Sequence, residues 1–167
     1  MTTTLPVPIE FELPGPEWQP VVPESLGVEN AAFLAVRQVA GEDYRPTITI
    51  SGDWRDDPAT LTDIADESLA KIRVQAEQAE LLERRVIESE HAPAVTQRLR
   101  AVATTESGTF ELQQAQAVTG LVDVADPTRR VVVIYTLTCT ADQMPVIGRE
   151  FQQFMATVHV VAPGEQS

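Results

Sequence analysis

The residues in this chain that could perform chemistry are few and widely spaced. Its two histidines, His91 and His159, have no second histidine and no cysteine at the spacings from which zinc and iron sites are built. Such metal sites need three or four ligands that converge on one point. We therefore expect structural or solvent-exposed roles for both histidines, and we expect no cofactor.

Two groups of carboxylates could bind a cation or transfer a proton. The first group contains four aspartates: Asp53, Asp56, Asp57 and Asp63. These aspartates lack the alternating ligands, the central glycine and the final glutamate of a calcium-binding EF-hand loop, so we interpret them as capping and solubilising residues. Glu10 and Glu12 could imitate a catalytic pair, but a surface strand carries such residues routinely.

The single cysteine, Cys139, excludes an internal disulfide and would act as a nucleophile only beside a base. Packing as a small apolar side chain is the simpler interpretation. No G-x-S-x-G, G-x-x-x-x-G-K-S/T or G-x-G-x-x-G motif occurs, which disfavours the common nucleophile-elbow and phosphate-loop enzymes. The sequence thus favours a protein that is not an enzyme.

The charge of the chain disfavours nucleic acid as a partner. Its 25 acidic and 12 basic residues give a net charge of −13, which repels phosphate backbones and anionic membrane surfaces. The sequence contains no run of 18 apolar residues, so we expect no stable insertion into a membrane. The basic residues cluster only at Arg84–Arg85, at Arg98 with Arg100, and at Arg129–Arg130. We interpret these arginines as partners for the many carboxylates, with an acidic ligand or partner surface as the alternative.

The hydrophobic pattern predicts the elements that must position these residues. Alternation with period two predicts strands over eight ranges: 7–13, 18–22, 31–39, 47–54, 81–90, 94–106, 109–121 and 129–139. Apolar spacings of three and four residues predict helices over 59–78 and from 140 to 158. We expect one α+β domain over residues 1–167, with an antiparallel sheet of about six to eight strands, two main flanking helices, and residues 1–5 and 162–167 as loose tails.

Local motifs refine this arrangement at the helix starts and in the last strand. Asp57 and Pro58 suit the N-cap and first positions of the first helix, and Thr140 with Gln143 matches a capping box before the second. Both alternating sets of residues in 129–139 are mostly apolar, which is typical of a central strand. We expect helices against one side of this strand and a different element against the other.

A face of small apolar and hydroxyl side chains is the predicted partner-binding surface. It contains seven residues: Val102, Thr104, Ala115, Ala117, Ile134, Thr136 and Thr138. Such a smooth surface suits close approach by a second protomer, a peptide or a hydrophobic helix. Arg98 and Arg100 complete the predicted site, because either could meet an acidic group.

The opening stretch EFELPGPEW carries a family resemblance. Phe11, Leu13, Pro14 and Trp18 resemble the short opening motif of the PsbP-like superfamily, which includes DcrB-like proteins, LpqN-type lipoproteins and Eag-type chaperones of secreted effectors. The order of predicted elements is similar as well. The resemblance implies an α/β/α sandwich, an accessory or binding role without a cofactor, and a structural role for Trp18. Unlike the lipoproteins, this sequence shows no signal sequence or lipid-acceptor cysteine.

Three functions are compatible with these observations. The first is a cytoplasmic, non-enzymatic adaptor or chaperone, expected to be a homodimer, that holds a segment of a secreted client on its sheet face. The second is a small-ligand carrier or enzyme with a cavity between sheet and helix, where Arg98 or Arg100 meets an acid beside Tyr135. The third is an immunity protein whose negative charge suits a basic toxin.

Overall fold

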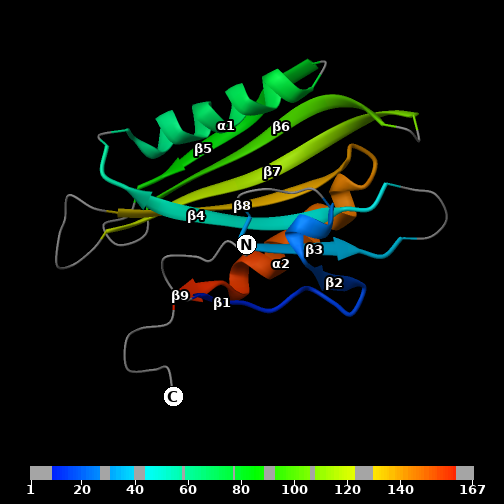
Figure 1. Cartoon of the computed structure of the whole chain (residues 1–167), viewed down its shortest axis with the longest axis horizontal. Coiled ribbons are helices and arrows are strands. Elements are labelled where there is room, and N and C mark those ends of the chain that lie inside the picture. Colours follow the sequence, from blue (N-terminus) through cyan, green and yellow to red (C-terminus); the bar gives the residue numbers. More distant parts are fainter. Residues whose placement is uncertain are drawn as a thin grey trace.

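The computed structural model describes residues 9–26, 31–39, 44–57, 59–76, 78–88, 93–105, 108–122 and 130–160. Its centre is a seven-stranded antiparallel sheet (Figure 1). In spatial order the strands are β2 (Trp18–Val21), β3 (Phe33–Arg37), β4 (Thr47–Arg55), β8 (Arg130–Thr140), β7 (Gly108–Val122), β6 (Ala94–Thr105) and β5 (Gln78–Ile87). Helix α1 (Leu61–Gln75) and helix α2 (Met144–Thr157) flank the sheet, and a short 3-10 turn, η1, spans Pro23–Leu26. The predicted α+β class is confirmed.

Two very short strands join the ends of the described chain. Strand β1 (Ile9–Glu10) pairs antiparallel with β9 (His159–Val160). A contact between the Glu10 carboxylate and the His159 ring, 3.2 Å long, supports this pairing at the surface. Strand β1 ends at Glu10, three residues before the predicted end at Leu13, because its described pairing with β9 involves only Ile9 and Glu10. Residues 7 and 8 lie outside the described ranges, as do both predicted tails.

Strand β8 occupies the middle of the sheet, between β4 and β7, as its two apolar faces predicted. Its residues Val133, Tyr135 and Leu137 point toward α2, and we call this side the α2 face. Val132 and Ile134 point to the other side, which α1 covers and which we call the α1 face. Each face thus carries one helix, so the expectation that helices lie on one side only is wrong.

The α2 face holds the larger, aromatic core. Phe154 of α2 is 0 % exposed, and its ring lies 5.3 Å from that of Phe11 and 6.4 Å from that of Tyr135 between centroids. Ile48 and Ile50 of β4 are also fully buried under the helix. These contacts confirm the predicted apolar stripe of α2, because this amphipathic helix buries the same side along its length.

The α1 face combines a small apolar cluster with a buried polar network. Ile64 and Ala65 of α1 pack on valines of the sheet. Gln97 donates through Nε2 to Gln116 Oε1 at 2.7 Å and to the carbonyl of Ala65 at 3.2 Å, while its Oε1 accepts from Arg84 Nη2 at 2.7 Å. Every buried side-chain N or O atom in the described ranges has a partner, so this network satisfies its polar groups despite their burial.

The sequence placed both helix starts three residues too early. The predicted reciprocal bonds between Thr140 and Gln143 form, since each backbone N–H donates to the other side chain, at 3.0 and 3.2 Å, but they close the turn before α2, whose N-cap is Gln143 without a side-chain cap. The N-cap of α1 is Thr60, not Asp57, and Asp63 completes a capping box with it. Thr60 accepts from the N–H of Asp63 at 3.0 Å, which Asp57 is too far upstream to do. Pro58 lies outside the described ranges.

Candidate functional site

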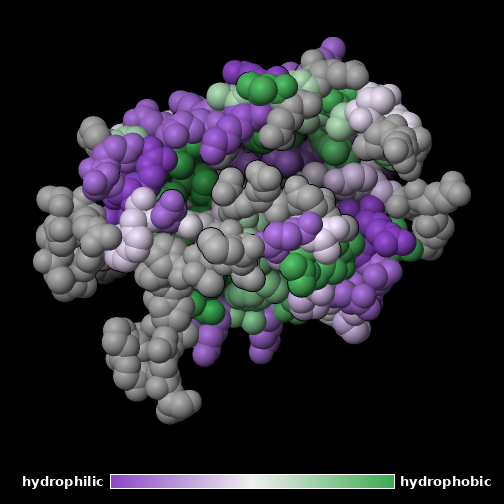
Figure 2. Space-filling view, in the orientation of Figure 1, coloured by the Kyte–Doolittle hydropathy of each residue, from purple (hydrophilic) through white to green (hydrophobic). Residues whose placement is uncertain are grey.

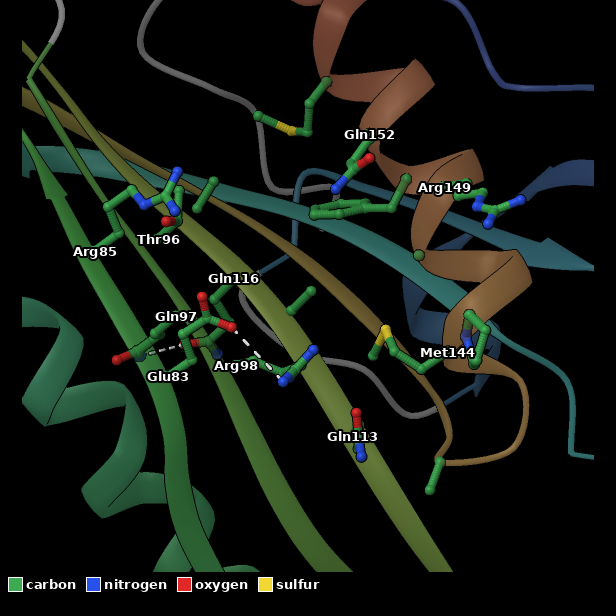
Figure 3. Close-up of a pocket in the computed structure, with 17 residues that line it drawn as sticks. Glu83, Arg85, Thr96, Gln97, Arg98, Gln113, Gln116, Met144, Arg149 and Gln152 are labelled. Atoms are coloured by element: carbon green, nitrogen blue, oxygen red, sulfur yellow. Dashed lines mark hydrogen bonds and ion pairs between the residues drawn. The ribbon is translucent and has the colours of Figure 1, made fainter.

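Helix α2 covers only part of the α2 face, and a groove lies beside it. The helix packs over β8, β4 and β3, whereas the α2 face of β5, β6 and β7 contributes one side of the groove. Figure 3 shows the helix on one side of this space and the three strands on the other. The groove has a volume of about 770 Å³ and is open to solvent. That size matches ordinary ligand and peptide sites.

The wall and part of the floor of the groove are apolar. Met144, Phe151 and Met155 of α2 form the wall, and Ala115 and Ala117 of β7 form the floor. Because alanine ends at Cβ, an incoming side chain can approach the backbone of β7 closely. Methionine side chains are flexible and polarisable, so this wall can adjust to different apolar groups. The groove can therefore hold an apolar segment of varied shape.

Positive charge surrounds this apolar region. Three arginines line the groove, Arg85, Arg98 and Arg149, against the single carboxylate of Glu83; in Figure 3 the guanidinium of Arg149 is turned away from the strands. Arg98 Nη2 lies 3.6 Å from Glu83 Oε2, a long and exposed pair that contributes little to stability. No described residue forms an ion pair or hydrogen bond with Arg85 or Arg149. The groove is thus positive in a protein whose net charge is −13.

These features suit binding of a ligand that has an apolar body and acidic groups. Guanidinium groups bind carboxylates through paired hydrogen bonds. Among the described residues that line the groove, Thr96 is the one hydroxyl, and none is a histidine or cysteine that could serve as general base or thiol nucleophile. The described ranges also hold no cluster of three or more potential metal ligands. The groove therefore has the chemistry of a binding site.

The opposite end of the α2 face is closed by a side-chain clamp. Trp18 is 3 % exposed, and its Nε1 donates to Glu150 Oε1 at 2.8 Å. Arg37 donates to both oxygens of Glu150, at 2.9 and 3.1 Å. Burial raises the pKa of Glu150, but the hydrogen bonds from Arg37 and Trp18 and the charge of Arg37 outweigh this, so the pKa lies below its ordinary value. Trp18 thereby joins β2 to α2, the structural role that the resemblance implied.

The structure separates the residues of the predicted partner surface. In the register of β7 with β8, Ala115 lies opposite Leu137 and Ala117 opposite Tyr135, so both alanines are on the α2 face. Four predicted residues share that face with them: Arg98, Arg100, Val102 and Thr104. The remaining three lie on the α1 face: Ile134, Thr136 and Thr138. The prediction of one continuous surface is wrong, because the sequence does not show which alternate set of one strand aligns with which set of the next.

The predicted residues on the α2 face divide again by position. Arg98 and the two alanines line the groove. Arg100 is held by Glu80, at 3.3 Å, and by Glu111, and these hydrogen bonds and charges raise its pKa. Val102 and Thr104 lie further along β6 and outside the groove. On the other face, Ile134 packs with the α1 cluster, and Thr138 accepts from Gln114 at 3.1 Å.

The other residues considered for chemistry have structural surroundings. Cys139 is fully buried, and burial raises the pKa of its thiol to about 12, so the thiolate is scarce at neutral pH. Asp57 binds Arg55 Nη2 at 2.5 Å, and this hydrogen bond lowers the pKa of Asp57. His159 contacts Glu10 at the surface, while His91 lies outside the described ranges. Tyr135 is buried under Phe154 and does not line the groove.

Two residues of the groove were missed in the sequence. Arg85 belongs to a cluster that was interpreted as partners for carboxylates, an interpretation that holds for Arg84 with Asp66 at 2.8 Å. Arg149 has no basic neighbour in the sequence, so no charge cluster indicated it. The usable signal was the period of 3.6 residues in α2, which places Arg149 beside Pro145 and Gln152 at the border of the apolar stripe. Arg129 lies outside the described ranges.

Helices of the described ranges are too short or too polar to cross a membrane. Figure 2 shows that the outer side of α1 is mostly hydrophilic. Its exposed side chains include Asp63, Asp66 and Glu67. This helix therefore presents water-facing charge, and the groove on the other face of the sheet is the better candidate for an apolar partner.

No family model matches the chain, and no curated protein sequence matches it. Solved structures do. LpqN of Mycobacterium tuberculosis, described as involved in cell envelope biogenesis, has a TM-score of 0.62 and 10% identity, and the match covers 94% of this chain and 86% of LpqN. CyanoP, the cyanobacterial PsbP of Synechocystis sp. PCC 6803, has a TM-score of 0.58 and 14% identity, with 92% of each chain covered.

A third similar structure is PA94 from Pseudomonas aeruginosa, a protein of unknown function and suggested regulator. Its TM-score is 0.56 at 22% identity, and the match covers 78% of this chain and 82% of PA94. At these identities the comparisons show the fold alone. The chain has the PsbP-like fold that the opening motif indicated.

Proposed function

We propose that this PsbP-fold protein is a non-enzymatic accessory protein that holds a segment of a secreted client in the groove between α2 and strands β5 to β7. The segment would place apolar side chains against the methionines of α2 and the alanines of β7. Its acidic groups would meet Arg85, Arg98 and Arg149. The contacts would resemble those of an apolar helix or strand lying in a preformed groove.

One observation carries this proposal: a positive, partly apolar groove in a protein of strongly negative charge. Elsewhere in the described ranges arginines such as Arg55 and Arg100 each bind two carboxylates. Three arginines line the groove, and only Arg98 among them is near a described carboxylate, that of Glu83. Unneutralised cations cost little while they are exposed, and they become favourable when a partner supplies carboxylates. The positive charge of the groove therefore favours binding of an acidic ligand.

The nature of the client comes from the resemblance and the comparisons. Eag-type chaperones, which the opening motif resembles, act on secreted effectors. LpqN, which shares the fold, is described as involved in cell envelope biogenesis. We propose that this chain meets its client in the cytoplasm, before secretion. Fractionation of the native cell checks this location: recovery of the protein mainly in the envelope fraction would contradict it.

Site-specific photocrosslinking tests the function. Gln152 lines the groove, whereas the next residue, Gln153, is exposed on α2 and does not line it. A benzophenone amino acid is placed at 152 or at 153 in the full chain within the native cell. After irradiation, mass spectrometry identifies the adducts. We expect one dominant protein adduct from position 152, at an apolar segment with nearby acidic residues, and none from position 153.

Two results would contradict the proposal. Equal adducts from both positions would show contact without selection by the groove. Absence of a protein adduct from position 152 in cells that express the protein at its natural level would remove the client.

A small acidic ligand is the second candidate, because the groove volume of about 770 Å³ also fits one. Native mass spectrometry of the purified chain separates the two functions. A bound small molecule that is lost on Arg98→Glu, together with no protein adduct, would favour the carrier. The matched control is Arg73→Glu, which changes an exposed charge on α1 by the same amount.

A further inference from the structure

The outer edge of β5 is a long strand edge with which no described strand pairs. The strand spans Gln78–Ile87, ten residues, whereas β2 at the other end of the sheet spans four. Alternate residues of an edge strand direct their N–H and C=O groups away from the sheet, where they can pair with another strand. The length of β5 therefore makes it the better docking edge of the two.

Exposed apolar side chains concentrate on this edge. Eight large apolar residues are exposed in the described ranges, and half of them lie on β5: Leu81, Leu82, Val86 and Ile87. Leu82 is 40 % exposed and Val86 is 54 % exposed. A long edge strand with apolar side chains is an aggregation hazard unless a specific partner covers it.

The charges on β5 could pair with the charges on the β5 strand of a second copy. Glu83 and Arg85 both point to the α2 face, where they lie opposite Arg98 and Thr96 of β6. Glu83 reaches Arg98 only at 3.6 Å, and no described residue pairs with Arg85. The edge thus offers an anion and an unpaired cation two residues apart.

We propose that a second copy of this chain pairs with β5 as an antiparallel strand, in the register that sets Glu83 of one copy opposite Arg85 of the other. This register places Arg84 on the two-fold axis. One Glu83–Arg85 pair, with one residue from each copy, then lies on each side of the axis, as an isologous interface requires. The two sheets become one continuous sheet.

Neighbouring registers are less favourable. A slip of one residue sets side chains of the α2 face opposite side chains of the α1 face. A slip of two residues sets Glu83 opposite Glu83 in one direction and Arg85 opposite Arg85 in the other. Like charges directly opposite each other destabilise a strand pair. The alternation of faces therefore disfavours the two slips of one residue, and the charges disfavour the two slips of two residues.

Arg84 does not oppose this pairing. Its Nη1 lies 2.8 Å from Asp66 Oδ1, and its Nε donates to Gln97 Oε1 at 3.0 Å, so its charge is already compensated within its own copy. Helix α1 packs over β5, β6 and β7 on the α1 face, whereas Glu83 and Arg85 lie on the α2 face, away from this helix. The register shift between Leu81 and Glu83 leaves Leu82 as a bulge residue without a partner in β6, so the proposed pairing rests on residues 83 to 85, which follow the bulge in regular register.

The pairing would also complete the groove. Glu83 and Arg85 line it, so the second copy would add its own Glu83 and Arg85 to the outer rim of each groove. Two grooves would then lie on the same face of one sheet. This inference concerns assembly and does not depend on the proposed client.

A charge-exchange series tests the interface on the full chain by sedimentation velocity over micromolar concentrations, without a client. We expect a dimer for the wild-type protein. Glu83→Arg and Arg85→Glu should each raise the dimer dissociation constant on the order of tenfold, because each places like charges opposite each other twice. The double exchange E83R/R85E should return it to near the wild-type value. Asp142→Arg and Arg45→Glu change the net charge by the same amounts at exposed sites away from β5 and should have no effect.

A wild-type monomer over this range would overturn the inference, and so would a dimer that neither single exchange weakens. Weakening by both single exchanges without rescue by the double exchange would overturn the register. Far-UV circular dichroism verifies that each variant is folded, as expected for exposed positions on a paired strand. A monomer that still crosslinks a client through position 152 would leave the proposed function standing, and a dimer without a client would leave the interface standing.

Discussion

The two ends of the α2 face differ in almost every physical respect. At the β2 end, Trp18, Arg37 and Glu150 lock the helix to the sheet with direct hydrogen bonds. At the β5 end, a groove separates the sheet from the helix, the floor of the groove carries alanine side chains, and the arginines have few partners. One end uses its side chains to hold the protein together. The other keeps its side chains available, at little cost in stability because they remain hydrated.

Breaking the closed end should have the largest effect on stability. Phe154→Ala removes a fully buried ring that packs against Phe11, Tyr135 and Phe151, so the free energy of unfolding should fall by about 3–5 kcal/mol. Urea denaturation measures it. Gln153→Ala, at the exposed neighbouring position, should change it by less than about 0.5 kcal/mol. Equal effects of the two changes would contradict the assignment of the core.

The clamp at the same end should give a smaller, pH-dependent effect. Glu150→Gln removes the charge that Arg37 binds, and should lower the free energy of unfolding by about 1–2 kcal/mol at pH 7. Because the pKa of Glu150 is depressed in the folded protein, its contribution is fully present above the ordinary value of 4.5 and is lost as the pH falls through the folded pKa. Urea denaturation of both proteins from pH 7 to pH 3 should show their difference shrinking in acid. A difference that grows below pH 4.5 would contradict the sign.

A substitution in the wall of the groove should separate stability from binding. Gly148 lies inside α2, where alanine is favoured over glycine by about 0.5–1 kcal/mol. A Cβ there would approach Met144 Sδ to 3.1 Å, and this flexible side chain can move aside toward the groove. Gly148→Ala should therefore raise the free energy of unfolding by up to about 1 kcal/mol while weakening the crosslink from position 152. A gain in stability with an unchanged crosslink would show that the wall does not contact the client.

The open end should be the least sensitive to loss of a side chain. Arg85→Ala removes an exposed group with no described partner, so the free energy of unfolding should change by less than about 0.5 kcal/mol. Arg37→Ala is the matched change at the closed end and should cost at least about 1 kcal/mol more, because it leaves the partly buried Glu150 without its cation. Thermal denaturation of both variants compares the two ends directly. Equal losses would abolish the distinction between them.

The elements were predictable because each depends on a local pattern. Alternation located β8 over Arg130–Thr140 and its central position, and the reciprocal side chains of Thr140 and Gln143 located the turn that leads into α2. The N-cap of α1 was misplaced because Asp57–Pro58 is also a favourable start, and only the fold shows that Thr60 meets the first free N–H groups. Local chemistry permitted both choices.

The site was less predictable, because it depends on how strands align. Ala115 and Thr136 both belong to mixed small-residue patterns, yet the antiparallel register puts them on opposite faces. A change of one residue in that register would have reversed the outcome. Arg98 was a candidate from the sequence and lines the groove, but Arg149 lines it from a helix that packs across the sheet, and no sequence spacing connects the two.

The clamp at Trp18 has a consequence for the order of synthesis. Its acceptor, Glu150, follows 132 residues later, and β4 likewise waits for β8. Strands β2, β3 and β4 pair with their neighbours in sequence, and so do β5, β6, β7 and β8, so each set can form as it leaves the ribosome. Contacts between distant residues form slowly because a large loop must close first. A nascent chain would therefore carry the β2–β3–β4 unit without β8 beside it and without α2 over it until translation is almost finished, which makes the last helix the step that commits the protein to its native state.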